Sequence, residues 1–155
     1  MNLEDEFLRE SNAIEGEHSE IALEDAKFSW EYAKKHKEEI DLNYILEVHA
    51  HLMRRLNPEI AGKVRDVPIE VVDGKYSCVD PEIIGKYLDL WLARDYKDEA
   101  RIDRLHTLFL IIHPFVDGNG RTSRILMNAQ RLNIGLPIKV IKASEKDAYY
   151  ERYFP

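Results

Sequence analysis

Apolar residues recur every three or four positions over most of the 155-residue chain, and this spacing constrains the fold more than any other feature. The clearest run spans residues 42–56 and is closed by Asn57-Pro58. Its apolar face consists of Leu42, Ile45, Leu46, His49, Leu52, Met53 and Leu56. Shorter runs with the same period lie at residues 3–8, 22–33, 83–92, 102–112 and 125–132. The pattern predicts a mainly α protein built from amphipathic helices.

Short signals mark where several of these helices should begin and end. Asp80-Pro81 combines an N-cap residue with proline at the first helical position. Gly135 is expected to stop the helix before it. Ser144 and Asp147 resemble a capping box, which predicts that a last helix begins there.

One segment departs from the helical period. Runs rich in β-branched residues at 67–72 and 75–79 flank Asp73-Gly74, a dipeptide typical of two-residue hairpin turns. The sequence therefore predicts one β-hairpin within a helical domain. No linker interrupts the pattern, so residues 1–155 are expected to form a single domain.

Charge and apolar content exclude several classes of partner. The formal net charge of -7 argues against a protein that grips a nucleic-acid backbone. The longest apolar run, residues 108–112, is too short to span a membrane. The only cysteine, Cys78, permits no intramolecular disulfide, and the first ten residues lack the apolar core of a signal peptide. We expect a cytoplasmic protein with no nucleic-acid and no membrane partner.

Residues 113–124 place small and charged residues between two apolar segments. His113 precedes a proline, so a helix is expected to end there. Gly118 and Gly120 permit positive φ angles and leave room for a ligand beside the backbone. A helix expected from near Thr122 would add unpaired amides and the positive end of its dipole. The stretch predicts an anion-binding loop.

The charged residues of this stretch suit a polyphosphate with a metal ion. Arg121 and Arg124 are three positions apart, so they should share a helix face and present forked donors to phosphate oxygens. Asp117 offers the hard oxygen that Mg²⁺ prefers. His113 can accept a proton near neutral pH. A Walker A loop would need Gly-Lys-Ser/Thr, which is not the pattern here.

The same twelve residues resemble the Fic-domain signature, H-x-F-x-(D/E)-G-N-G-R-x-x-R, with every fixed position filled. The resemblance implies the Fic fold, a helical bundle with a β-hairpin flap that would be residues 67–79. It also implies transfer of AMP from ATP to a protein hydroxyl, with Mg²⁺ as cofactor. The protein substrate would dock on the flap by adding an extended segment to its edge. A homodimer is compatible with the resemblance.

The resemblance also assigns roles to individual residues. His113 would deprotonate the Ser, Thr or Tyr hydroxyl of the target, and Asp117 would hold Mg²⁺. Arg121 and Arg124 would bind the β- and γ-phosphates. The other residues expected around the nucleotide are Val71, Val72, Asp73, Gly74, Gly118, Asn119, Gly120, Thr122, Ser123, Tyr149 and Tyr150.

Residues 11–16, Ser-Asn-Ala-Ile-Glu-Gly, resemble the inhibitory motif of the family, (S/T)-x-x-x-E-(G/N). Ser11, Glu15 and Gly16 fill its fixed positions, on a helix expected within residues 1–20. The resemblance implies that Glu15 pairs with Arg124 and competes with the γ-phosphate for its guanidinium group. The expected protein is an auto-inhibited AMP-transferase. In some relatives the same glutamate supports removal of AMP.

Two other functions stay open. A phosphotransferase of the Doc kind would invert the nucleotide and move its γ-phosphate, although the intact Gly120-Arg121 pair favours AMP transfer. A nucleotide-sensing module without turnover is the second. Among the remaining polar residues, His49 and His106 are interpreted as structural, and Arg65 as part of a structural ion pair beside the flap.

Overall fold

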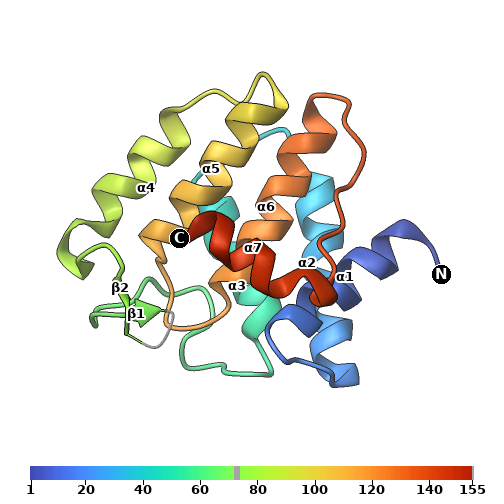
Figure 1. Cartoon of the computed structure of the whole chain (residues 1–155), viewed down its shortest axis with the longest axis horizontal. Coiled ribbons are helices and arrows are strands. Elements are labelled where there is room, and N and C mark those ends of the chain that lie inside the picture. The colour runs from blue at the N-terminus through green and yellow to red at the C-terminus, as the bar shows by residue number, and fades with distance from the viewer. Residues whose placement is uncertain (72–73, 155) are drawn as a thin grey trace.

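The computed structural model describes residues 1–71 and 74–154. Within them the chain forms seven α-helices and one two-stranded antiparallel sheet (Figure 1). The elements are α1 (Leu3–Ile14), α2 (Glu20–His36), α3 (Leu42–Met53), β1 (Glu70–Val71), β2 (Tyr76–Ser77), α4 (Ile84–Ala93), α5 (Glu99–Ile112), α6 (Asn119–Asn133) and α7 (Lys146–Tyr153). Short 3₁₀ turns precede α4 at Pro81–Ile83 and α7 at Ala143–Glu145. The prediction of a mainly α fold with one β-hairpin is confirmed.

Helix α6 lies at the centre of the bundle. It packs against α5, α3, α2 and α1, and α2 packs against α3. Residues 121–131 of α6 are all buried, and they include Arg121, Arg124 and Arg131. Arginine is almost never fully buried unless its charge is paired, so we expect partners for these three guanidinium groups inside the fold. The helix that follows the glycine loop is therefore also the core helix of the fold.

Helix α6 begins three residues earlier than predicted. It starts at Asn119 rather than near Thr122, and Gly118 takes the N-cap position with a φ of 85°. Its other end is as predicted, because Gly135 has a φ of 80° and the Leu136 amide donates to the carbonyl of Arg131. The glycine loop is shorter than expected, and Asn119 and Gly120 belong to the first helical turn.

The capping box predicted at Ser144 and Asp147 is wrong. Helix α7 is entered through the 3₁₀ turn, its N-cap residue is Glu145, and no side chain caps it. The Ala143 amide instead donates to the Glu10 carboxylate on α1, 2.6 Å away. A contact with a distant helix thus replaces the local cap.

The hairpin strands are shorter than the β-branched runs. Glu70 pairs with Ser77 and Val71 with Tyr76. Gly74 has a φ of 81°. Val72 and Asp73, predicted to border the nucleotide, lie outside the described residues.

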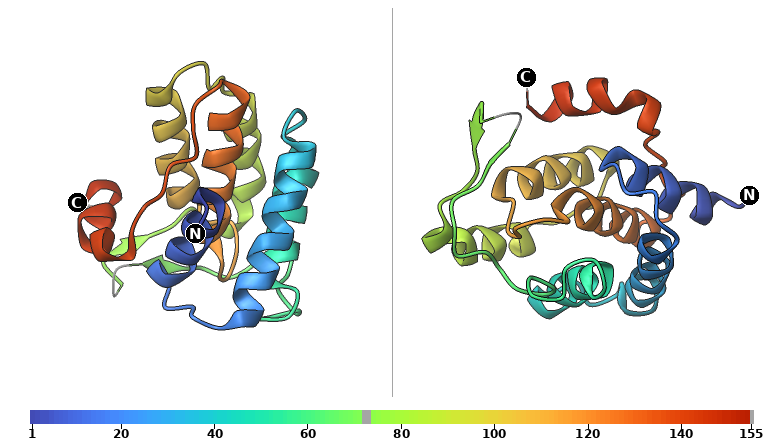
Figure 2. Two further views of the ribbon diagram at one scale, coloured as in Figure 1. Left: turned by 90° about the vertical axis from the view of Figure 1, so that its right-hand side faces the viewer. Right: turned by 90° about the horizontal axis from the view of Figure 1, so that it is seen from below.

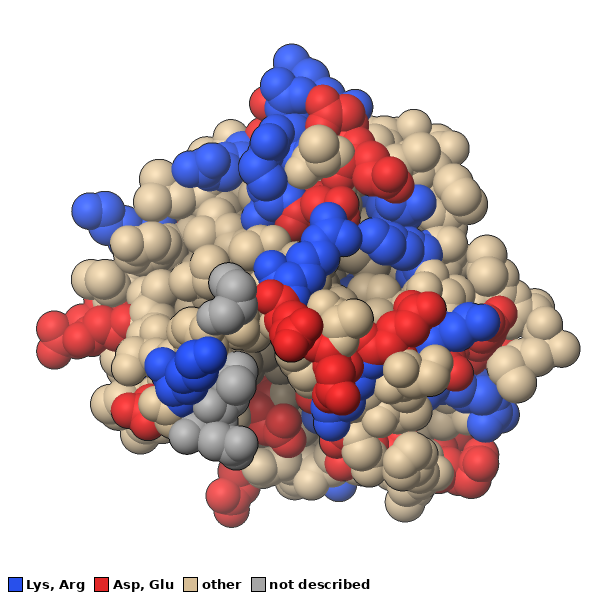
Figure 3. Space-filling view, in the orientation of Figure 1, with Lys and Arg blue, Asp and Glu red and all other residues tan. Residues whose placement is uncertain are grey.

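The hairpin and α7 lie on the same side of the molecule, over α5 and α6 (Figure 2). The rings of Tyr76 in β2 and Phe154 after α7 come within 5.6 Å of each other, measured between centroids. Acidic and basic side chains are interspersed on the face that carries α7 (Figure 3). None of the described helices is long and apolar enough to cross a membrane.

Candidate active site

His113 ends α5 in a left-handed backbone conformation, with φ 50° and ψ 61°. It is the only described residue other than glycine with a positive φ, a strained state typical of functional sites. Its Nδ1 lies 3.2 Å from the Leu110 carbonyl oxygen, which can only accept. The proton therefore sits on Nδ1, and the lone pair of Nε2 is available. Burial lowers the pKa of His113. The hydrogen bond to Leu110 raises this pKa, the nearby Arg65 charge lowers it further, and the pKa is lowered overall.

Arg65 holds the backbone on which this imidazole depends. Its Nε donates to the His113 carbonyl at 2.6 Å, and its amide donates to the Pro114 carbonyl at 2.9 Å. The remaining guanidinium donors reach the carbonyls of Val67 and Val79, which flank the hairpin. The predicted ion pair of Arg65 is wrong, because its partners among the described residues are backbone carbonyls. This one side chain ties the hairpin to the end of α5.

The turn between α5 and α6 is closed by Asn119. The Asn119 side chain accepts from the Phe115 amide at 2.9 Å and donates to the Phe115 carbonyl at 2.8 Å. Because the Asn119 side chain is buried and holds this turn, the group of Asn119 that can face a ligand is its backbone amide. Phe115 is completely buried and anchors the loop in the core.

The N-terminus of α6 presents amides and very little side-chain bulk. The first intrahelical bond joins the Thr122 amide to the Gly118 carbonyl, so the amides of the preceding turn have no helical partner. A Cβ atom added at Gly120 would clash with Oε1 of Glu15 and lie 2.9 Å from a terminal nitrogen of Arg124. Glycine is therefore required for a carboxylate to approach the helix end. The same amides and dipole suit a phosphate group.

Glu15 occupies this position in the structure. It lies at the end of α1, and its Oε1 accepts from a terminal nitrogen of Arg124 at 2.7 Å. Ser11, one helical turn earlier, accepts from Nε of Arg124 at 2.7 Å through its hydroxyl. The Ser11 carbonyl accepts from Arg124 as well, at 3.1 Å. The two residues four positions apart on α1 thus bind one guanidinium group.

The attraction between the two charges is strong because the Arg124 side chain is only 1% exposed and water screens it weakly. The Glu15 side chain is 26% exposed. Burial raises the pKa of Glu15, but the charge of Arg124 and its hydrogen bond outweigh burial, so the pKa is lowered overall. Gly16 ends α1 with a φ of 73°, and the Glu17 amide donates to the Asn12 carbonyl. This helix-end motif fixes the place where the Glu15 side chain leaves the helix.

Asp117 and Arg121 form the other side of the loop. The Asp117 side chain is 65% exposed, and its Oδ1 accepts from the Gly118 amide at 2.8 Å and lies 3.7 Å from Arg121. Nε of Arg121 is buried without a hydrogen-bond partner among the described residues. Arg121 and Arg124 do not share one surface as predicted, because Arg124 turns toward α1 and Arg121 toward Asp117.

The donor set fits a Mg²⁺ ion that arrives with a nucleotide. Within the described residues no group of three or more His, Cys, Asp or Glu side chains could hold a metal by itself. Magnesium is commonly held by one or two carboxylates with phosphates and water completing its shell. The exposed carboxylate of Asp117 at the rim of the amide cluster matches this arrangement.

The two tyrosines of α7 have different positions. Tyr150 borders the cavity, and its hydroxyl lies 3.3 Å from Oε2 of Glu15. Tyr149 is buried, and its hydroxyl contacts Arg124 at 3.3 Å and Nε2 of His106 at 2.7 Å. Only Tyr150 is placed to contact a ligand directly.

His106 was missed as a neighbour of the site because sequence spacing put it two turns away from His113. Its Nδ1 lies 2.6 Å from the Ser123 hydroxyl, and complete burial lowers the pKa of His106 to about 3. Arg124 donates to the Tyr149 hydroxyl, which thus links the guanidinium group to the imidazole of His106. The side chains of Thr122 and Ser123 are buried inside the bundle and do not border the cavity. A single sequence carries no signal that α7 packs over α5, so the contact between His106 and Tyr149 could not be predicted from it.

A cavity of about 640 Å³ lies between the hairpin, the α5–α6 turn and α7. This size is within the range of small-molecule sites. The lining residues are Glu15, Val71, Leu110, His113, Gly120, Asp147, Tyr150, Glu151 and Phe154. The Gly120 amide end and the His113 imidazole border one part, while Leu110 and the rings of Tyr150 and Phe154 offer apolar surface.

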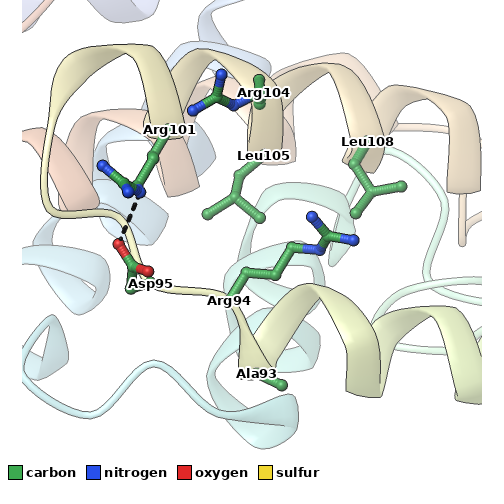
Figure 4. Close-up of a pocket in the computed structure, with 7 residues that line it drawn as sticks. All are labelled: Ala93, Arg94, Asp95, Arg101, Arg104, Leu105 and Leu108. Atoms are coloured by element: carbon green, nitrogen blue, oxygen red, sulfur yellow. Dashed lines mark ion pairs between the residues drawn. The ribbon is translucent and has the colours of Figure 1, made fainter.

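A second hollow of about 360 Å³ lies between α4 and the start of α5 (Figure 4). Arg94, Arg101 and Arg104 surround it, with Leu105 and Leu108 pointing from α5 toward α4. Asp95 partly neutralises it through an ion pair with Arg101 at 3.1 Å. Since it lies toward the opposite end of α5 from His113, it is separate from the candidate active site.

Comparisons with known proteins agree with this geometry. The sequence pattern of the Fic/DOC family matches residues 39–130. Protein adenylyltransferase fic-1 of Caenorhabditis briggsae is 33% identical over 146 residues, which cover 86% of this chain and 28% of that protein. Protein adenylyltransferase Fic of Nematostella vectensis is 32% identical over 144 residues, covering 87% and 33%. The chain therefore spans about a third or less of these curated relatives.

Solved structures agree on the fold. A Fic domain containing signaling protein from Bacteroides thetaiotaomicron superimposes with a TM-score of 0.81 at 21% identity, over 97% of this chain and 70% of that one. Fic-1 from Caenorhabditis elegans gives a TM-score of 0.77 at 23% identity, over 96% and 54%. Because the family pattern covers more than half of the sequence, the chain belongs to the Fic/DOC family.

Proposed function

We propose that this protein transfers AMP from ATP to a hydroxyl group of a target protein, and that Glu15 inhibits the reaction. The observation that carries the proposal is the arrangement in one cavity of a basic Nε2 on His113, the amide end of α6 at Gly120, and the Glu15–Arg124 pair. The names of the relatives, protein adenylyltransferases, support the same reaction class.

The reaction needs a base and a place for polyphosphate. Nε2 of His113 would take the proton of a Ser, Thr or Tyr hydroxyl. The freed oxygen would bond to the α-phosphorus while the bond to the leaving pyrophosphate breaks. The amides at Asn119 and Gly120 would hold the phosphate oxygens, joined by the Gly118 amide once Asp117 turns from it to the metal, and Arg121 would turn from Asp117 toward them. Mg²⁺ bound at Asp117 would neutralise part of the polyphosphate charge.

Inhibition would follow from competition for Arg124. A γ-phosphate and the Glu15 carboxylate are both anions, and the guanidinium group already donates to Glu15 at 2.7 Å. Charge-assisted arginine–carboxylate bonds are stronger than neutral ones, and burial protects this one from water. ATP would bind productively once Glu15 has left.

The protein substrate would dock on the hairpin. A two-stranded sheet leaves one edge on each strand, and Val71 of β1 borders the cavity. A target segment added to that edge would bring its hydroxyl toward His113. Leu110, Tyr150 and Phe154 would contact the nucleoside.

The position of the label distinguishes this reaction from γ-phosphate transfer. The Glu15→Gly variant should incorporate radioactivity from ATP labelled at the α-phosphate and none from ATP labelled at the γ-phosphate. Incorporation from the γ-label alone would assign a phosphotransferase, and incorporation from neither label would favour a nucleotide-sensing module.

A further inference from the structure

His49 on α3 connects the core to the loop that carries the candidate active site. Its Nε2 lies 2.8 Å from the Asp117 carbonyl oxygen, and its Nδ1 accepts from the Gly62 amide at 2.9 Å. The imidazole also stacks on Phe115, with centroids 3.6 Å apart and rings 7° from parallel. His49 is completely buried, so its polar atoms face these partners rather than solvent.

The partners of His49 determine where its proton lies. The Gly62 amide can only donate, so Nδ1 is the acceptor. The Asp117 carbonyl can only accept, so Nε2 carries the hydrogen. One neutral imidazole therefore holds two separate backbone segments, and its stacking on Phe115 fixes the plane of the ring.

The loop lies directly against this side chain. A Cβ atom added at Gly118 would be 2.9 Å from the sulfur of Met53 and 3.2 Å from Nε2 of His49. The side chains of His49 and Met53 thus pack directly against the backbone of residues 117 and 118. A hydrogen bond to the backbone of Asp117 sets the direction from which its exposed carboxylate leaves the loop.

We propose that His49 is a positioning residue that holds the Asp117 carboxylate where it can bind the Mg²⁺ ion of an incoming nucleotide. The proposal rests on the proposed function. Groups that support a metal ligand from behind commonly change metal affinity by about 10- to 100-fold when they are removed. A histidine that only fills the core would affect stability and leave the contribution of Mg²⁺ unchanged.

Two amide side chains separate these roles. In His49→Gln the amide can follow Nε2 to the Asp117 carbonyl while its oxygen accepts from Gly62. In His49→Asn the side chain is one bond shorter, so it can keep the Gly62 bond but falls short of Asp117. His51→Asn is the matched control, because His51 lies on the same helix and contacts Glu47 on the outer face at 3.6 Å.

The test is the ATP dissociation constant measured by calorimetry, with Mg²⁺ and with EDTA, in the Glu15→Gly protein. The ratio is the dissociation constant in EDTA divided by the constant with Mg²⁺. We expect this ratio to fall about tenfold or more in His49→Asn. The ratio should stay near the starting value in His49→Gln and in the His51→Asn control, and binding in EDTA should not change. Asp117→Asn removes the carboxylate itself, so it should give the largest fall in this ratio.

An unchanged ratio in His49→Asn, with only a lower melting temperature, would overturn the role of His49 and leave the proposed function intact. If Glu15→Gly with native His49 binds ATP but shows no effect of Mg²⁺, the metal site at Asp117 is wrong and the role of His49 falls with it. If that protein binds no ATP at all, the proposed function fails. Should His49→Asn fail to fold, His49→Leu decides, because leucine fills similar space and cannot donate to the Asp117 carbonyl: a ratio that falls about tenfold or more supports the proposal, and an unchanged ratio overturns it.

Discussion

Arg124 is a buried cation whose charge is balanced by the chain itself. Its donors reach the Ser11 hydroxyl and carbonyl, the Glu15 carboxylate and the Tyr149 hydroxyl. A buried charge that loses its partner is costly, so Glu15 contributes to folding as well as to the proposed inhibition. An anionic ligand could replace Glu15 here without leaving the guanidinium group unpaired.

Ser11→Ala removes one charged hydrogen bond and leaves the ion pair in place. We expect the free energy of unfolding to fall by about 1–3 kcal/mol, because the bond is buried and its donor is charged. Urea denaturation measures the change, with the exposed Ser144→Ala as a control that should shift by less than about 0.5 kcal/mol. Equal effects of the two substitutions would show that Ser11 does not hold Arg124.

The basic form of His113 should persist below the pH at which a free imidazole is protonated. Burial lowers the pKa of His113, so the neutral ring is the main species at pH 7 and above. The rate of AMP transfer by Glu15→Gly is therefore expected to be flat above about pH 6.5 and to fall in more acidic buffer. A rate that still climbs steeply between pH 7 and 8.5 would contradict His113 as the base.

At the scale of elements, the motif residues that touch each other come from helices far apart in sequence. The spacing of Ser11 and Glu15 on one face of α1, and the signature at residues 113–124, were visible in the sequence and meet in the structure. His49, Arg65, His106 and Asn119 act through partners 2 to 68 positions away, and periodicity alone cannot identify such partners. The false capping box at Ser144 has the same cause, since Glu10 on α1 supplies the bond.

The end of α1 depends on a left-handed residue. Gly16→Ala is expected to lower the free energy of unfolding by about 1 kcal/mol, because an L-residue is strained at a φ of 73° although space is available. The control is Gly85→Ala inside α4, where the added methyl group also meets nothing within 4 Å and φ is not positive. That change should stabilise the protein by up to about 1 kcal/mol. Thermal denaturation of both variants checks the opposite signs.

At the scale of the whole molecule, α1, the α5–α6 turn, α7 and the hairpin meet around one cavity. Helix α7 is joined to the core through Tyr149 and His106, and to the hairpin through the contact of Phe154 with Tyr76. A disturbance of this packing should therefore reach Arg124. His106, the buried neutral histidine in this packing, should make the stability of the protein sensitive to acid.

Stability should decline as the pH falls below about 6.5. The pKa of His106 is about 3 in the folded protein and about 6.5 when unfolded, so the unfolded chain binds the additional proton between these values. The unfolding free energy is then expected to drop by up to about 1.4 kcal/mol per pH unit from this residue, or about 1.6 kcal/mol between pH 6.5 and pH 5.

Urea denaturation at pH 7, 6 and 5 measures this slope in the parent and in His106→Gln. The parent should lose more stability than the variant over the same range, because glutamine does not titrate. Parallel slopes would show that His106 is not the group responsible.

The intact mass of the Glu15→Gly protein after incubation with ATP and Mg²⁺ tests the central claim most directly. The account predicts a gain that matches one or more adenylyl groups, little or no gain in the parent, and none when His113→Ala is added to Glu15→Gly. Equal masses for Glu15→Gly and the parent would contradict inhibition through the Glu15–Arg124 pair. A gain that survives His113→Ala would contradict the assignment of the base.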